Sequence, residues 1–146
     1  MEAVIPKNLH LGIYGLIEQA ERILLIRKSR GPYKDLFDLP GGRPNHGEPL
    51  LEALRREIKE ETGIETSSYS LFENFSFLIP YQDSQGNQKE LYHIALAYRV
   101  NNADFESLNP EIVDEDVNGS LWINWHELRK ERCSPLLRKV LENYEK

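Results

Sequence analysis

Runs of apolar residues along the chain predict a set of strands. The runs at residues 9–17 and 22–27 are rich in Leu, Ile and Tyr and are separated by four polar or small residues, so together they predict a β-hairpin. Two longer runs, residues 69–79 and 89–100, flank a polar tip that contains a Gly-Asn pair and predict a second hairpin. The short apolar run at residues 121–123 predicts one more strand.

Helical spacing of apolar residues is clearest over residues 49–61. Pro49 suits the first turn, Glu48 places a negative charge beside the helix N-terminus, and Gly63 fits the position just past the end. This segment is therefore the best-defined predicted helix of the chain.

Two further helices are predicted near the C-terminus. Residues 125–131 predict a short helix. Ser134 as N-cap and Pro135 at the first helical position begin a last helix that runs to about Tyr144. Long strands in antiparallel pairs with a few helices predict an α+β fold, in which a mixed sheet lies between helices, and we expect one domain over residues 1–146.

Three carboxylates lie on one face of the predicted helix. At 100° per residue, the helix presents an apolar stripe to the core, formed by Leu51, Leu54 and Ile58. The adjacent face carries Glu57, Glu60 and Glu61. A solvated acidic face would explain a random cluster of this kind. A hard cation such as Mg²⁺ is the alternative, because it takes oxygen ligands and relieves the repulsion between carboxylates.

A glycine-rich turn, Pro40-Gly41-Gly42, precedes this helix. Glycine lets the backbone approach a phosphate or a metal closely. Without other evidence, a Gly-Gly pair is most simply interpreted as part of a turn. Beside the carboxylate helix, Gly41 and Gly42 become candidates for the floor of a substrate site.

Composition narrows the classes of function. The net charge of -6 would repel a polynucleotide backbone, so we expect a small-molecule partner and no nucleic-acid polymer. The single cysteine, Cys133, excludes an intrachain disulfide framework and is expected to be a small buried residue. Without a signal-peptide core or a membrane-length apolar stretch, the cytoplasm is the expected location and no membrane partner is expected.

The segment from Gly42 to Ile64 resembles the signature box of the Nudix (MutT-like) hydrolases. Every fixed position of that box is filled, by Gly42, Glu48, Arg56-Glu57, Ile58, Glu60-Glu61, Gly63 and Ile64. The resemblance implies the family's α/β/α sandwich. It also implies metal-dependent hydrolysis, with Mg²⁺ as the metal and Mn²⁺ as an alternative.

The resemblance also implies roles for the residues of the box. Glu57, Glu60 and Glu61 would hold the metal ions, and Glu57 or a neighbouring glutamate would orient or deprotonate the attacking water. Arg56 and Glu48 would pair with these glutamates and fix their rotamers. The carbonyl group around Gly42 would join the metal ligands.

Outside the box, the resemblance implies one further acid from a later loop. Glu115 and Asp116 are both candidates, and a solvated acidic loop is an equal alternative for this stretch. Arg27 and Lys28 are candidates for binding the distal phosphate.

Four residues with aromatic rings also have predicted roles. Tyr33 and Phe37 are candidates for stacking on a base. His93 is expected to be a packed histidine, and Trp122 is expected in the core.

The predicted activity is hydrolysis of a pyrophosphate linkage in a nucleoside diphosphate linked to another moiety, through attack of water on phosphorus. The alternative is a Nudix-like domain that binds a nucleotide or nucleotide sugar without cutting it. Oxidised nucleoside triphosphates, ADP-ribose, nucleotide sugars and capped nucleotides are all compatible substrates. The sequence pattern specifies no subunit interface, so it neither predicts nor excludes a homodimer.

Overall fold

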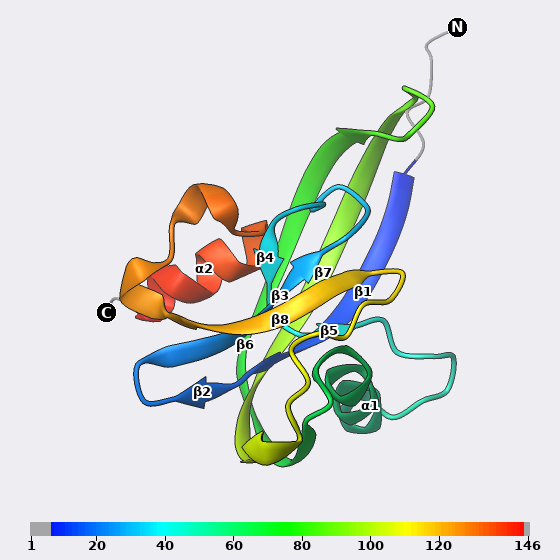
Figure 1. Ribbon diagram of the computed structural model, residues 1–146. Helices are drawn as coiled ribbons and strands as arrows, with labels where there is room; N and C mark the ends of the chain where they lie inside the picture. Colours follow the sequence, from blue (N-terminus) through cyan, green and yellow to red (C-terminus); the bar gives the residue numbers. More distant parts are fainter. Residues whose placement is uncertain (1–6, 145–146) are drawn as a thin grey trace, which may run out of the picture.

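Residues 7–144 are described by the computed structural model, in which two small sheets lie between two helices (Figure 1). The strands are β1 (Lys7–Leu16), β2 (Glu18–Gln19), β3 (Arg22–Lys28), β4 (Phe37–Asp38), β5 (Gly41–Gly42), β6 (Glu65–Gln82), β7 (Gln88–Asp104) and β8 (Val117–Asn124). The helices are α1 (Leu50–Thr62) and α2 (Pro135–Tyr144). Three single 3₁₀ turns cover Phe105–Ser107, Trp125–Glu127 and Lys130–Arg132.

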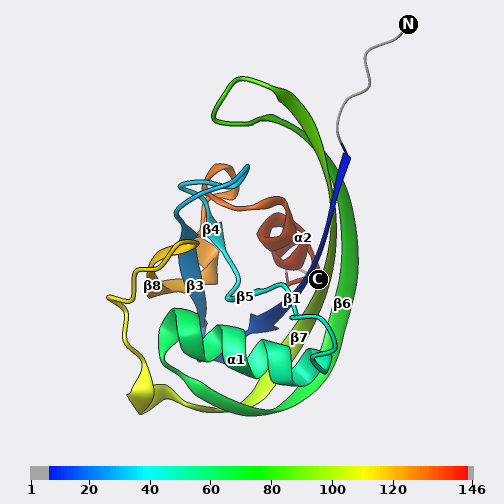
Figure 2. The ribbon, with the colours of Figure 1, turned by 90° about the vertical axis from the view of Figure 1, so that its right-hand side faces the viewer.

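One sheet has the order β5-β1-β7-β6, and the other has the order β2-β3-β4 with β8 paired to β3. The pairing of β1 with β7 is parallel and the remaining pairs are antiparallel, which makes the first sheet mixed. The long β6–β7 hairpin curves around the rest of the chain (Figure 2). The predicted α+β fold with a mixed sheet between helices is confirmed.

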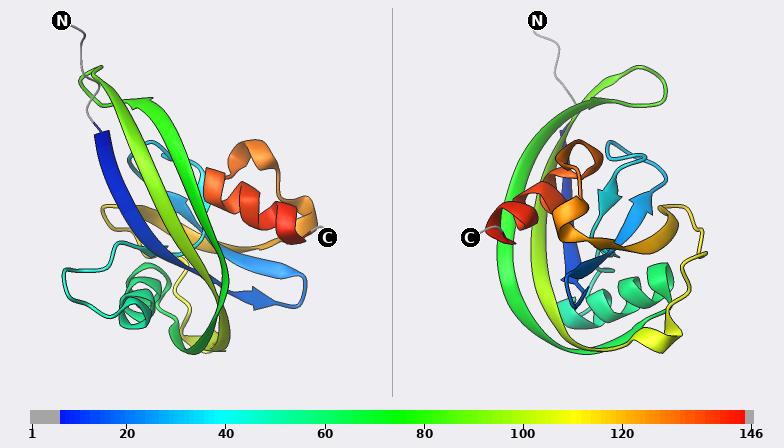
Figure 3. Two further views of the ribbon diagram at one scale, coloured as in Figure 1. Left: turned by 180° about the vertical axis from the view of Figure 1, so that it is seen from behind. Right: turned by 60° about the vertical axis from the view of Figure 1, so that its left-hand side comes forward.

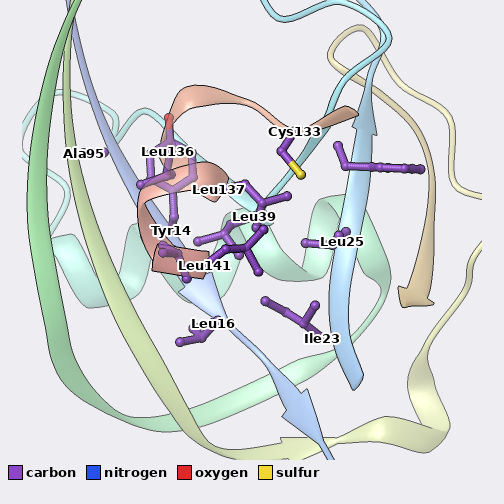
Figure 4. Close-up of a cluster of buried hydrophobic side chains, with 12 residues drawn as sticks. Tyr14, Leu16, Ile23, Leu25, Leu39, Ala95, Cys133, Leu136, Leu137 and Leu141 are labelled. Atoms are coloured by element: carbon purple, nitrogen blue, oxygen red, sulfur yellow. The ribbon is translucent and has the colours of Figure 1, made fainter. Parts of the chain in front are cut away.

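Alternate side chains of β1 and β3 point to opposite helices, as the two-residue period of a strand requires. Ile13 and Leu24 pack with α1, whereas Leu16 and Leu25 pack with α2. Figure 3 shows the two helices on opposite sides of the sheets, and Figure 4 shows the cluster around α2. Both sheets therefore have two buried faces where they lie between the helices.

The first predicted hairpin is wrong in its pairing. The chain leaves one sheet after β1 and enters the other at β2, so only the two residues of β2 pair antiparallel with β3. The body of the run, β1, lies parallel to β7. An apolar run reports that a strand is buried but not which strand it pairs with.

The second predicted hairpin is confirmed, and its strands extend further than the apolar runs at both ends. The predicted strand at residues 121–123 is confirmed as the second half of β8. The predicted helix at residues 125–131 is wrong, because the segment forms two 3₁₀ turns instead.

The predicted helix at residues 49–61 is confirmed as α1, one residue later in the chain. Gly63 ends it in the left-handed conformation, with φ 81° and a hydrogen bond from its N–H to Lys59 O. Leu54 and Ile58 are fully buried as predicted, but Leu51 is 42% exposed. The helix extends past the core at its N-terminal end, so Ala53 takes the place in the stripe that was predicted for Leu51.

The C-terminal helix and the buried residues agree with expectation. Ser134 Oγ accepts a hydrogen bond from Leu137 N, which confirms the predicted N-cap of α2. Cys133 and His93 are buried, and Trp122 packs against the cluster that contains Leu54. Within residues 7–144, no helix has both the length and the apolar character needed to cross a membrane.

Candidate active site

Helix α1 carries two of the predicted carboxylates to the wall of a cavity of about 390 Å³. This carboxylate cavity is lined by Glu57 and Glu61 of α1, by Gly41 and Gly42 of β5, and by residues of β1, β3 and the loop before β8. The apolar stripe of α1 packs against β1 and β3, which holds the neighbouring carboxylate face at the cavity.

Glu61 is a carboxylate taken almost completely out of water. It is 3% exposed, and Gly41 N donates a hydrogen bond of 2.7 Å to its Oε1. Burial raises the pKa of Glu61 well above its usual range, and the nearby Glu57 adds to the increase. A cation bound in the cavity would offset this cost, because it would restore the favourable surroundings of the ionised form.

Glu57 is partly buried beside Glu61. Burial raises the pKa of Glu57, while Arg56 opposes this shift through a hydrogen bond of 2.9 Å from its Nη1 to Glu57 Oε1. Gly42 lies directly against the carboxylate: a Cβ placed on Gly42 would lie 2.8 Å from Glu57 Oε2. The absence of a side chain at position 42 therefore leaves the space in which Glu57 sits.

Arg56 connects three of the acidic residues. Its Nε and Nη2 donate hydrogen bonds of 2.8 and 2.9 Å to the two carboxylate oxygens of Glu48, and its Nη1 reaches Glu57 and Glu60. The fork of two parallel bonds fixes the guanidinium plane. Arg56 thus pairs with Glu57 from outside the cavity, and its role in fixing the Glu57 rotamer stays a prediction.

Glutamine in place of Glu48 is expected to lower stability most at neutral pH. The hydrogen bond from Arg56 lowers the pKa of Glu48 from 4.5 to about 2. Since the folded pKa lies below the unfolded one, the stabilisation is complete above about pH 4.5 and is lost as the pH falls toward about 2. Urea midpoints of both proteins at pH 7 and pH 3 measure the difference. An equal difference at both pH values would contradict the assignment, and Glu52→Gln on the exposed side of α1 is the control.

The carboxylate cavity is also lined by three cations. Lys28, Arg30 and Arg43 all line it, together with Asp116. Arg30 Nε donates a hydrogen bond to Asp116 Oδ1, so one of these cations is already paired. An anionic ligand in the cavity would meet Lys28 and Arg43.

The predicted site residues fall into three groups. Those at the carboxylate cavity are Gly41, Gly42, Lys28, Glu57, Glu61 and Asp116. Glu48, Arg56 and Glu60 lie behind it in the network described above. The Glu60 side chain is 53% exposed and pairs with Arg56, so the structure places it on the solvent side of α1.

Three predicted residues lie away from the carboxylate cavity. Glu115 has a side chain that is 85% exposed, and it pairs with Arg30. Phe37 is 7% exposed within the core around α2. The guanidinium of Arg27 lies 5.5 Å from the centre of the Phe37 ring. Of the two loop acids that the sequence could not separate, Asp116 is the one at the cavity.

Several residues of the cavity were not singled out from the sequence. Asp38 is buried at its wall, and His10, Tyr14 and Arg43 also line it. One signal was present for Asp38, since it is a charged residue inside an otherwise apolar step before the glycines. No local pattern marks His10 and Tyr14, because they reach the site through the long-range pairing of β1.

The residues present fit a divalent cation, although no three His, Cys, Asp or Glu side chains converge as a metal-binding group within residues 7–144. Mg²⁺ usually takes one or two carboxylates and completes its shell with water and substrate phosphates. Glu57 and Glu61 supply two carboxylates, both with a raised pKa, beside the open backbone of Gly42.

Comparison with known proteins places these features in a wider group. A family model described as the NUDIX domain matches residues 7–144. An ADP-ribose pyrophosphatase of Methanocaldococcus jannaschii is 42% identical over 77 residues, which cover 53% of this chain and 44% of that protein. A putative 8-oxo-dGTP diphosphatase of Bacillus subtilis is 46% identical over 48 residues, 33% of this chain and 30% of that one. The chain thus matches less than half the length of these curated relatives.

Solved structures are similar over nearly the whole chain. A MutT NUDIX hydrolase from Burkholderia pseudomallei superposes with a TM-score of 0.70 at 25% identity, covering 92% of this chain and 97% of that one. A MutT protein from Methanosarcina mazei has a TM-score of 0.67 at 24% identity, covering 97% and 96%, and shares the fold.

Proposed function

Because the chain belongs to the NUDIX domain family, we propose that it is a metal-dependent hydrolase that cleaves the pyrophosphate linkage of a nucleoside diphosphate derivative. The observation that carries the proposal is the carboxylate cavity itself, in which Glu57, Glu61, Lys28 and Arg43 line one space of about 390 Å³. A space lined by both carboxylates and cations suits a phosphate chain held between a metal and cationic side chains.

The residues of this chain divide the work of hydrolysis. Glu57 and Glu61 would hold the metal, with the carbonyl group around Gly42 and with Asp116 as the loop acid. When bound, Mg²⁺, or Mn²⁺ in its place, supplies charge neutralisation on the phosphoryl oxygens and lowers the pKa of a bound water. Lys28 and Arg43 would bind the phosphates, and Arg56 would keep Glu57 in place. Glu57 or a neighbouring glutamate would orient or deprotonate the attacking water.

The two curated relatives point to two kinds of substrate. One is named for ADP-ribose and the other for 8-oxo-dGTP. Both compounds have a pyrophosphate linkage, so the shared chemistry is the bond that is cut. We therefore propose the reaction class and keep both compounds as members of the test panel.

The experiment is a panel of nucleotide substrates assayed for release of monophosphate, pyrophosphate or phosphate. The panel contains ADP-ribose, 8-oxo-dGTP, a nucleotide sugar and a capped nucleotide, each with Mg²⁺, with Mn²⁺ and with excess chelator. We expect turnover of at least one compound with metal, and loss of turnover with chelator that added Mg²⁺ restores. Binding without turnover across the panel would instead support the alternative of a nucleotide-binding domain, and metal-independent turnover would contradict the proposed mechanism.

A further inference from the structure

A second cavity, of about 510 Å³, adjoins the carboxylate cavity. This outer cavity shares Tyr14, Lys28, Asp38 and Arg43 with it and adds Tyr33 to the wall. If the proposed function holds, a substrate with its phosphates beside Glu57 and Glu61 extends its remaining moiety into the outer cavity. The side chains of this wall therefore decide which moiety is accepted.

Five side chains form one continuous hydrogen-bond chain, of which four line the outer cavity and the fifth, His93, is buried behind them. Arg43 Nη2 lies 3.1 Å from His10 Nδ1, and His10 Nε2 lies 3.3 Å from the Tyr14 hydroxyl. The Tyr14 hydroxyl lies 2.8 Å from His93 Nε2, and His93 Nδ1 lies 2.9 Å from the Tyr33 hydroxyl. The chain runs from a cation at one end to a phenol at the other.

Arg43 sets the direction of the first two bonds in this chain. A guanidinium has donors and no acceptor, so His10 Nδ1 must accept and the imidazole proton must lie on Nε2. His10 Nε2 then donates to the Tyr14 oxygen, and the Tyr14 hydroxyl donates to His93 Nε2. His93 consequently carries its proton on Nδ1 and donates it to the Tyr33 oxygen. The hydroxyl proton of Tyr33 is left over at the end.

The opposite direction beyond Tyr14 is less favourable. With the His93 proton on Nε2, the Tyr14 oxygen would accept from both histidines, and its own proton would be left over. Tyr14 is 5% exposed and Tyr33 is 7% exposed, but the Tyr14 hydroxyl also lies directly against Gly12, where an added Cβ would collide with it. An unpaired buried donor costs about 1–3 kcal/mol. Burial keeps both histidines neutral, lowering the pKa of His10 to about 4 and that of His93 to about 3.

Asp38 supplies an acceptor on the same wall. Its Oδ1 accepts from both Leu39 N and Ser134 Oγ, while its Oδ2 has no hydrogen-bond partner among residues 7–144. In that part of the chain, Ser120 Oγ is the only fully buried side-chain polar atom without a partner. Asp38 Oδ2 therefore retains accessible surface, although the residue as a whole is 2% exposed and lines both cavities.

We infer that Tyr33 and Asp38 determine specificity, by offering a fixed hydroxyl donor and a carboxylate acceptor to the substrate moiety in the outer cavity. The complementary ligand presents an acceptor to Tyr33 and a donor to Asp38. Sugar hydroxyl groups and the polar edge of a nucleobase both have this chemistry. A purely apolar or purely anionic moiety lacks it, and would leave both protein groups unpaired.

The direction of the chain is measured without any substrate. The ¹⁵N chemical shifts of the imidazole nitrogens distinguish the two neutral tautomers of histidine. We expect the proton of His10 on Nε2 and that of His93 on Nδ1. A His93 proton on Nε2 would reverse the end of the chain and overturn the inference, whether or not the protein is a hydrolase.

The role of Tyr33 is measured as binding with chelator present, where the proposed hydrolysis does not occur. The probes are an ADP-linked sugar, the methyl ester of ADP, and nucleotides that differ in the polar edge of the base. Tyr33→Phe is expected to lower the affinity for the probe that fills the outer cavity by roughly five- to tenfold, which corresponds to the loss of one hydrogen bond. A loss for the ADP-linked sugar but not for the methyl ester places the sugar in the outer cavity, and a loss that changes with the polar edge of the base places the base there. An equal loss for every probe, whatever its sugar or base, would overturn the inference.

Two variants complete the design. Tyr69→Phe is the matched control, because the Tyr69 hydroxyl forms its hydrogen bond with Thr66, away from both cavities. The affinities of this variant for all probes should equal those of wild type. Asp38→Asn keeps an oxygen that can accept from Ser134 and Leu39, but it replaces the free acceptor by a donor. It should therefore lower the affinity for the same probe as Tyr33→Phe does. Unchanged affinity of both cavity variants for every probe would overturn the inference, whereas failure of the proposed function would appear separately, as absent turnover with Mg²⁺.

Discussion

Glutamine in place of Glu61 is expected to lower kcat by about 10²–10⁴-fold with the fold intact, the range seen when a group that handles the proton or its metal is removed. The substitution removes the negative charge and keeps an oxygen that can accept the hydrogen bond from Gly41 N. Steady-state kinetics at saturating Mg²⁺ on the best compound of the panel measures the loss. A rate near wild type would contradict the role of Glu61 as a metal ligand.

Stability provides the control for Glu61→Gln. Burial raises the folded pKa of Glu61 above its unfolded value, so without metal the folded protein binds the extra proton more tightly. Stability of metal-free wild type should therefore fall as the pH rises from about 4.5 toward the raised pKa. The fall should be smaller in the variant, where only Glu57 and Asp38 still contribute to it. Thermal unfolding with chelator at pH 5 and pH 8 tests this. Glu52→Gln, on the exposed side of the same helix, should leave kcat unchanged and cost only the few tenths of a kcal/mol that an acid in the first turn contributes, equally at pH 5 and pH 8.

Alanine in place of Gly42 is expected to lower kcat by about 10²-fold while the unfolding temperature changes little. The new Cβ would lie 2.8 Å from Glu57 Oε2, so the carboxylate must move away from its place in the cavity. A shift of about 1 Å in a catalytic group can cost this much in rate. The fold should tolerate the change, because the flexible end of Glu57 yields and Gly42 has no left-handed backbone conformation.

Gly47→Ala is the matched opposite of Gly42→Ala. Gly47 has φ +77° and no atom within 4 Å of the added Cβ, so alanine there strains the backbone without touching the carboxylates. It should lower stability by about 1 kcal/mol and leave kcat unchanged. If Gly42→Ala lost stability and kept its rate, the close contact with Glu57 would have no role in catalysis.

The sequence predicted α1 and its acids well, because a helix with its caps is a local structure. The separation of Glu60 from Glu61 was harder. Successive helical residues point 100° apart, so residues on one broad face can end in different surroundings. The predicted burial of Leu51 was wrong for a related reason. Periodicity identifies the apolar stripe of a helix, but it does not show at which turn that stripe leaves the core.

The wall opposite α1 could not be predicted, because it is assembled by long-range pairing. His10 and Tyr14 reach the site through the parallel register of β1 with β7, and an apolar run does not identify its partner strand. Asp38 gains its role from Ser134, which is 96 residues away in the chain. These contacts depend on topology rather than on local composition.

The parallel pairing of β1 with β7 also has a consequence for synthesis of the protein. Tyr14 and His93 are joined across 79 residues, so the ribosome must translate most of the chain before β1 can find its place. At ordinary elongation rates, this delay is on the order of ten seconds. Contacts of such long sequence separation also slow folding itself. Helix α1, which carries the carboxylates, can thus form early because its contacts are local. The part of the cavity that contains His10 and Tyr14 is completed late. A nascent chain can therefore have the carboxylate helix before the rest of the cavity exists.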